Sequence, residues 1–97
     1  MRETSCQIDR GTFTVTYRGK TCFLGYTMAF RLLERLAEAR GIFIPIETLI
    51  DDVWGGRGVS EEAVQRQVST LRAKLKAAEA KGVHIEAQPG HYRLILS

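Results

Sequence analysis

Apolar residues recur at helical spacing between Ser60 and Lys81, and this pattern predicts the longest helix in the chain. Four of them share one face at spacings of four, three and four: Val64, Val68, Leu71 and Leu75. That spacing produces an apolar stripe that a helix can bury against a core. Ser60 is a favourable N-cap, and Gly82 is a natural stop after the last turn.

Two shorter helices are predicted before this one. Residues 28–40 repeat apolar side chains at helical spacing, and Thr27 is their candidate N-cap. A second helix begins at Pro45, because proline is favoured at a helix start, and its apolar face extends to Trp54. Residues 42–44 between the two helices are predicted to form a short apolar link.

Strand-like segments occur at both ends of the chain. Three short N-terminal strands are predicted over residues 6–8, 12–18 and 21–24, with a tight turn at Gly19-Lys20. Two C-terminal strands are predicted over residues 83–87 and 91–96, around Gln88-Pro89-Gly90. Three helices followed by a hairpin are typical of a winged helix-turn-helix. The sequence therefore predicts an α+β fold with an N-terminal antiparallel sheet, three helices and a C-terminal β-hairpin wing.

Length and composition are those of one ordinary globular domain over residues 1–97, with 44% apolar and 26% charged residues. Lys and Arg number 14 against 11 Asp and Glu, which permits a nucleic-acid partner without requiring one. No apolar run reaches membrane-spanning length, and the first residues lack the apolar core of a signal peptide. We therefore expect a cytoplasmic protein without a membrane partner.

No residue pattern predicts a catalytic centre, a metal site or a cofactor, so the sequence does not indicate an enzyme. Cys6 and Cys22 are the only cysteines, and His84 and His91 stand at no metal-ligand spacing from them. We interpret the two thiols as small apolar groups on strands. A disulfide between two adjacent strands remains the alternative. The glycines at 55–58 lack the Lys-Ser/Thr pair of a phosphate-binding loop.

The face of the long helix opposite its apolar stripe has an unusual composition. Arg66 is surrounded there by small residues, namely Ser69, Thr70 and Ala73. A helix that enters a groove needs small side chains for close approach and an arginine for reach. The alternative interpretation is an ordinary solvated helix face, which is the commoner case for such a segment considered by itself.

Five segments, in this order and spacing, resemble the OmpR/PhoB-type winged-helix effector domain of bacterial two-component response regulators. They are the N-terminal strands ending near Leu24, FRLLERLAEARG at 30–41, LIDDVWG at 49–55, VSTLRAKL at 68–75 and GHYRL at 90–94. The resemblance covers nearly the whole chain. It implies a four-stranded N-terminal sheet, three helices and a wing. It also implies that the last helix enters the DNA major groove and that the wing approaches the minor groove.

On this basis the chain is expected to bind double-stranded DNA in transcription regulation. Four residues would face base edges: Arg66, Ser69, Thr70 and Ala73. Five would contact the backbone or belong to the wing: Arg72, Lys74, Lys76, His91 and Arg93. Arginine can pair with guanine, while serine and threonine can hydrogen-bond or touch a thymine methyl group. For Arg72 and Lys74, a solvated face or an ion pair with Glu79 is an equally good interpretation.

The resemblance implies further partners. The loop between the second and third helices would face RNA polymerase, with Gly55, Gly56, Arg57 and Gly58. Family members commonly bind as pairs on direct-repeat DNA, so a dimer on DNA is expected. No receiver domain for a phosphorelay occurs in these residues, which are compatible with a part of a longer regulator or with an independent domain.

Two departures from the family pattern favour a second hypothesis. Ser69 and Thr70 replace basic residues that are common there, and the wing residues Pro89–Tyr92 are shorter than the family's R-G-x-G-Y and lack its arginine. Three alanines stand on the outer side of the helix: Ala73, Ala77 and Ala80. The alternative function is therefore a winged-helix protein–protein interaction module without significant DNA affinity.

Overall fold

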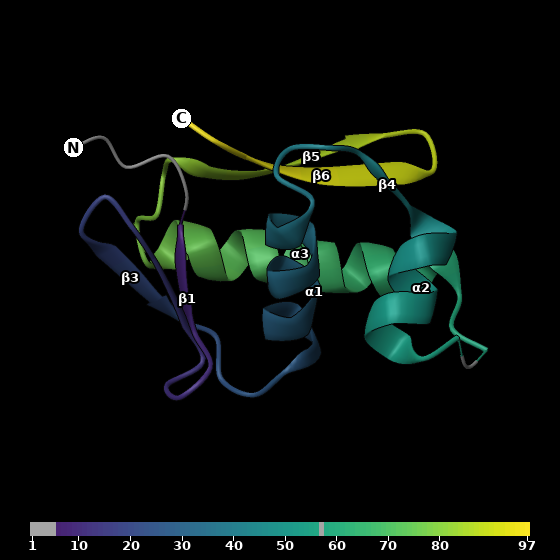
Figure 1. Ribbon diagram of the computed structural model, residues 1–97, viewed down its shortest axis with the longest axis horizontal. Coiled ribbons are helices and arrows are strands. Elements are labelled where there is room, and N and C mark those ends of the chain that lie inside the picture. Colours follow the sequence, from purple (N-terminus) through teal and green to yellow (C-terminus); the bar gives the residue numbers. More distant parts are fainter. Residues whose placement is uncertain (1–5, 57) are drawn as a thin grey trace.

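The computed structural model describes residues 6–56 and 58–97, in which three helices pack with two antiparallel sheets (Figure 1). The elements in chain order are β1 (Gln7–Asp9), β2 (Thr14–Tyr17), β3 (Lys20–Phe23), α1 (Met28–Glu38), β4 (Ile44–Pro45), α2 (Ile46–Trp54), α3 (Glu61–Ala77), β5 (Val83–Gln88) and β6 (His91–Leu96). This arrangement confirms the predicted α+β winged-helix fold, with its N-terminal sheet, three helices and C-terminal hairpin.

The N-terminal sheet has the strand order β1-β2-β3. Among the described residues it has three strands, as the residue pattern predicts, and not the four that the resemblance implies. The turn between β2 and β3 is formed by Arg18 and Gly19, with φ of 51° and 80°. It therefore lies one residue before the predicted Gly19-Lys20, because a two-residue hairpin turn of this kind needs positive φ at both central positions.

The same strand order separates the two cysteines. Cys22 lies on β3 and Cys6 immediately precedes β1, so β2 lies between their strands. Both cysteines are free thiols, and their strands are not adjacent, which argues against the alternative of a bridge between neighbouring strands. Burial raises the pKa of each thiol, and for Cys22 the nearby Lys74 partly opposes this effect.

The C-terminal sheet has the order β4-β6-β5, so the wing is more than a hairpin. Residues predicted to be a link form β4, in which Ile44 pairs with Tyr92 and Pro45 pairs with His91. The ladder continues into α2, because the N–H of Ile46 donates to the carbonyl of Gly90 at 2.9 Å. A strand of two residues is too short to show an alternating pattern in the sequence. Strand β4 forms because the free edge of β6 provides backbone groups with which it can pair.

The helices begin where their caps predict. Thr27 Oγ1 accepts a hydrogen bond from the N–H of Phe30, and Ser60 Oγ accepts one from Ala63, both at 3.3 Å. These bonds satisfy N–H groups that have no partner within the helix. Pro45 stands at the N-cap of α2 without a side-chain bond.

Both α1 and α3 end earlier than predicted. Helix α1 stops at Glu38, before Arg40, which has a positive φ of 50°. Helix α3 stops at Ala77, four residues before Lys81, because Glu79 adopts a left-handed conformation with φ of 58°.

A Schellman motif ends α3. The N–H of Ala80 donates to the carbonyl of Leu75 at 2.9 Å, and that of Glu79 to Lys76 at 3.0 Å. The motif turns the chain so that Ala80 is buried beside the core. Glycine usually occupies the left-handed position at a helix C-terminus. Because this chain has a glutamate there, the sequence does not predict that the helix ends at this point.

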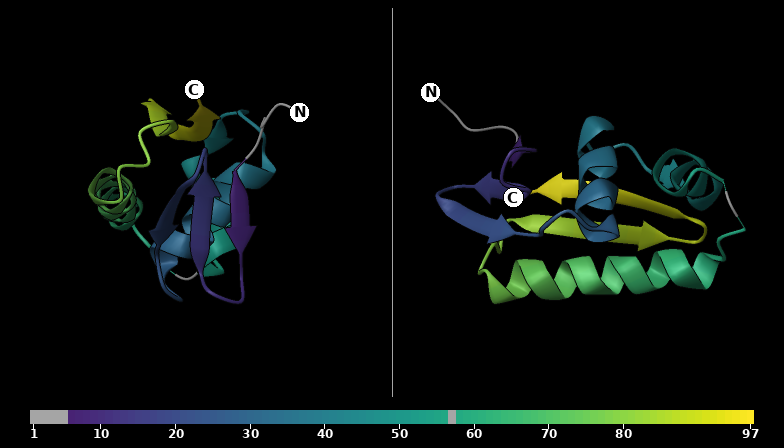
Figure 2. Two further views of the ribbon diagram at one scale, coloured as in Figure 1. Left: turned by 90° about the vertical axis from the view of Figure 1, so that its left-hand side faces the viewer. Right: turned by 90° about the horizontal axis from the view of Figure 1, so that it is seen from below.

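The core lies between α3, α1 and the inner faces of both sheets. The predicted stripe on α3 is buried, and Leu71 and Val64 have no exposed surface. They pack in one cluster with α1 residues such as Leu33 and Leu36. Helix α3 runs along one side of the molecule, as the two views in Figure 2 show, and its opposite face is open to solvent.

Candidate nucleic-acid interface

The open face of α3 presents most of the residues that the sequence predicts to face DNA bases. Arg66, Ser69 and Ala73 are exposed, whereas Thr70 is half-buried on the flank of the helix. They are displayed because the buried stripe lies on the other side of the same helix. The helix thus offers one long cation among short side chains, as expected.

Arg66 is free to bind a ligand within the described part of the chain. Among residues 6–56 and 58–97, its guanidinium has no ion pair and no side-chain hydrogen bond. Lys74 and Lys76 are likewise exposed and have no carboxylate partner among these residues. Glu79, the alternative partner considered for Lys74, instead lies 3.7 Å from the ammonium of Lys20. An unpaired exposed cation loses no internal contact when it binds a phosphate.

Arg72 has a different position. Its Nη2 donates to the backbone carbonyl of Ile85 at 2.7 Å, which joins α3 to β5. It pairs neither with Glu79 nor with another described carboxylate. An arginine has five N–H donors in total, so the remaining donors stay available for a phosphate.

Arg93 is committed to the wing itself. Its Nε and Nη2 donate to Glu86 Oε1 at 2.9 and 2.7 Å, and its guanidinium carbon lies 4.4 Å from the ring centroid of Phe43. The side chain is half-buried, so it joins β6, β5 and the segment before β4. Arg93 is therefore a poor candidate for a DNA contact, because binding a phosphate would require it to give up these contacts.

The tip of the wing is held close to α2. His91 is half-buried, and its Nδ1 lies 2.9 Å from the carbonyl oxygen of Pro89. The adjacent Gly90 carbonyl accepts the first N–H of α2. The wing of this chain is therefore short and fixed, and it does not project as a free loop.

The loop between α2 and α3 is exposed at Gly55, Gly56 and Gly58. Gly55 ends α2 in a left-handed conformation, with φ of 74°. Arg57, the fourth predicted polymerase-facing residue, lies outside the residues that the structure describes.

The structure also gathers basic residues that the sequence analysis did not assign to the interface. Arg18 and Lys20, at the β2–β3 turn, lie close to the C-terminal end of α3, and Lys81 lines an open groove with both. Some sixty residues separate these positions in the chain, so no local sequence pattern could connect them.

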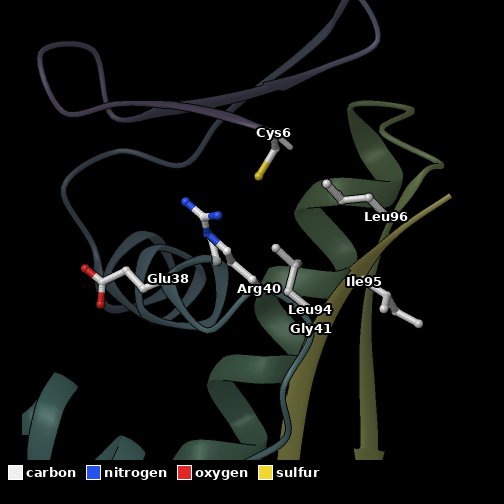
Figure 3. A pocket seen from close by; sticks show the side chains of 8 residues that line it. Cys6, Glu38, Arg40, Gly41, Leu94, Ile95 and Leu96 are labelled. Carbon is white, nitrogen blue, oxygen red and sulfur yellow. The ribbon is translucent and has the colours of Figure 1, made fainter. Parts of the chain in front are cut away.

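A cavity of about 750 Å³ lies away from the open face of α3, between Cys6, the end of α1 and β6 (Figure 3). The sulfur of Cys6 points toward the guanidinium of Arg40, while Glu38 points away from both. Burial raises the pKa of Cys6 and keeps the thiol protonated and weakly nucleophilic.

Within residues 6–56 and 58–97, no group of three or more His, Cys, Asp or Glu side chains could hold a metal ion. In the same part of the chain, no helix has both the length and the apolar character needed to cross a membrane.

Comparison with known proteins gave one family. A family model described as "Transcriptional regulatory protein, C terminal" matches residues 25–94. The matched region contains all three helices, strand β5 and the first four residues of β6, including the open face of α3. No curated protein matches the chain significantly.

Proposed function

We propose, because this chain belongs to the family of C-terminal DNA-binding domains of transcriptional regulatory proteins, that it binds double-stranded DNA at specific sequences. The open face of α3 supports this proposal most directly. It combines an unpaired Arg66 with small residues, so the helix backbone can approach base edges closely. A helix about 10–12 Å wide fits the major groove, which is about 12 Å wide.

In this proposal each part of α3 has a separate role. Arg66 donates two hydrogen bonds to a guanine, and Ser69 or Thr70 bonds a neighbouring base. Ala73 leaves room for the groove floor or contacts a thymine methyl group. Lys74, Lys76 and the remaining N–H donors of Arg72 contact phosphates, which position the helix without selecting a sequence.

The wing contributes less than the family resemblance implies. Its turn is bonded to α2, so we expect it to lie near the minor groove without inserting into it. His91 and main-chain groups of the turn are then backbone contacts, and base selection depends on α3. A single module of this size makes few base contacts, so we expect tighter binding by two copies on a direct repeat than by one copy on one half-site.

We also propose a protein partner and a cellular compartment for this chain. The exposed glycines Gly55, Gly56 and Gly58 belong to the loop that would meet RNA polymerase, and Arg57 of the same sequence segment is expected to take part. The expected setting is the cytoplasm, as part of a response regulator in a phosphorelay. These expectations follow from the resemblance of the chain to the OmpR/PhoB type.

Selection of bound fragments from a random duplex library tests the function directly. We expect enrichment of a short motif containing at least one guanine, and loss of preference at that base when Arg66 is changed to Ala. A library that shows no enrichment over several rounds, with a folded protein, would contradict specific DNA binding.

A second candidate function is a protein-interaction module. Phe23 and Tyr26 are 69% and 76% exposed, and the Tyr26 ring lies 5.1 Å from that of Phe13. Exposed aromatic groups of this kind favour a protein partner. Salt dependence separates the two functions, because phosphate contacts make affinity fall steeply with salt whereas apolar contacts do not.

A further inference from the structure

We propose that a second DNA-backbone contact is made at the C-terminal end of α3 with the help of the N-terminal sheet. This inference rests on the proposed DNA binding and assigns part of the contact to the β2–β3 turn, outside the helices and the wing. We call the group the C-terminal basic cluster. Its members are Arg18, Lys20, Arg72, Lys74, Lys76 and Lys81.

The β2–β3 hairpin is docked firmly against the end of α3. Tyr17 Oη donates to the carbonyl of Ser97 at 3.0 Å, and a Cβ at Gly82 would lie only 2.6 Å from the Tyr17 ring. On the next strand, Cys22 Sγ lies 3.5 Å from the carbonyl oxygen of Lys74. The contacts of Tyr17 and Cys22 therefore hold the backbone of the turn beside α3, so that Arg18 and Lys20 project from a fixed position.

Two open grooves of about 330 Å³ run through the cluster. One lies between α3 and β5 and is lined by Arg72, Lys76, Lys81 and His84. The other lies between the β2–β3 turn and the segment after α3, and Lys81 lines both. Grooves lined by several cations suit the anionic oxygens of consecutive phosphates.

Charge is distributed unequally along α3. Six basic residues surround its C-terminal end, where the carboxylate of Glu79 lies 3.7 Å from the ammonium of Lys20. The N-terminal end has acidic residues instead: Glu47 and Asp51 on α2, and Glu61 and Glu62 on α3. A phosphate backbone is repelled by the acidic end and attracted to the basic end. The DNA is therefore expected to extend beyond the C-terminal end of α3 toward the β2–β3 turn.

The test compares three single variants that each remove one positive charge. Arg18→Gln and Lys81→Gln lie in the cluster, and Arg31→Gln, on the exposed side of α1, is the matched control. Binding to a selected site with long duplex flanks is measured from 50 to 200 mM salt. Each cluster variant should lower affinity about eightfold at 0.1 M salt and reduce the logarithmic salt slope by about 0.9, as loss of one phosphate contact predicts. Arg31→Gln should match the wild type.

A fourth variant, Glu79→Gln, should change affinity in the opposite direction, because it removes the carboxylate that competes with phosphate for Lys20. If the wild type binds its site and Arg66→Ala weakens it, while Arg18→Gln and Lys81→Gln behave like Arg31→Gln, the basic cluster is overturned and DNA binding stands. If the wild type shows no salt-dependent binding to any duplex, the proposed function is overturned, and the cluster with it.

Discussion

The side chain of Arg72 on α3 donates a hydrogen bond of 2.7 Å to the backbone carbonyl of Ile85 on β5. This bond joins the helix proposed to enter DNA to the first strand of the wing. Together with the Gly90–Ile46 bond at the wing tip, it holds the wing at two places, the middle of β5 and the turn between β5 and β6. The relative position of helix and wing is therefore already fixed in the free protein, which would limit the conformational entropy lost on DNA binding.

Arg72→Ala should lower the free energy of unfolding by about 1 kcal/mol, because it removes a hydrogen bond with a charged donor at a partly exposed site. Urea denaturation measures the change. Arg72→Lys is the control for charge, since it keeps the positive charge and replaces the guanidinium donor with an ammonium group. Stability equal to that of the wild type for Arg72→Ala would mean that the bond is absent in solution.

Arg66→Ala should leave the fold intact and lower specific DNA affinity by roughly 1–3 kcal/mol, because we propose that its guanidinium contacts a guanine. Fluorescence anisotropy on the selected site, beside the same site with the guanine replaced, measures the loss and the relaxed preference. Lys76→Ala should instead weaken binding to all sequences alike and flatten the salt dependence.

Leu71→Ala is the matched control for Arg66→Ala, because Leu71 lies on the same helix but is fully buried. It should destabilise the protein by roughly 2–5 kcal/mol through the cavity it leaves. Thermal melts followed by circular dichroism separate the two effects. If Arg66→Ala binds like the wild type while Leu71→Ala melts early, α3 is a structural helix and the interaction-module function is favoured.

Glu79→Gly should stabilise the protein by about 0.5–1 kcal/mol. Glu79 has a φ of 58°, and the left-handed conformation costs an L-residue about 1–2 kcal/mol, of which the greater chain entropy of glycine offsets part. The melting temperature should rise by a few degrees. Ala78→Gly is the control and should lower it, because Ala78 has a φ of −86°. A fall in melting temperature for Glu79→Gly would refute the Schellman motif at this helix end.

The cysteines should give a pH dependence of stability without affecting DNA binding. Burial raises the pKa of Cys22 in the folded state, so the unfolded chain releases its proton first as pH rises. The Cys22 thiol contributes its full share of the free energy of unfolding at pH values below its pKa in the unfolded chain. This contribution decreases as pH rises above about 8.5 toward the pKa of the thiol in the folded protein. Urea denaturation between pH 7 and 10 should show a smaller decline for Cys22→Ala than for the wild type. Equal declines would exclude Cys22 as the cause, and DNA binding that changes with reductant would contradict the separation of the thiols by β2.

Much of the fold could be predicted from the sequence, because its local signals agree with the tertiary packing. The stripe from Val64 to Leu75 fits only a helix with one buried side. Ser60 and Thr27 cap their helices through side chains three residues from the bonded N–H, so their roles depend on neighbouring residues alone. The open face with Arg66 follows from the same periodicity, because whatever is opposite a buried stripe is exposed.

Only the tertiary structure decided what depends on residues far apart in the chain. Strand β4 exists because β6 offers it an edge, and α3 ends early because burial of Ala80 outweighs the poor fit of glutamate to a left-handed position. Arg93 is drawn into the wing by Glu86 and Phe43, whereas a sequence shows only a basic residue after a tyrosine. Arg18 and Lys81 meet because the β2–β3 hairpin packs on the end of α3. The interaction between two charged side chains depends on the distance between them in space, and the fold sets that distance independently of their separation in the sequence.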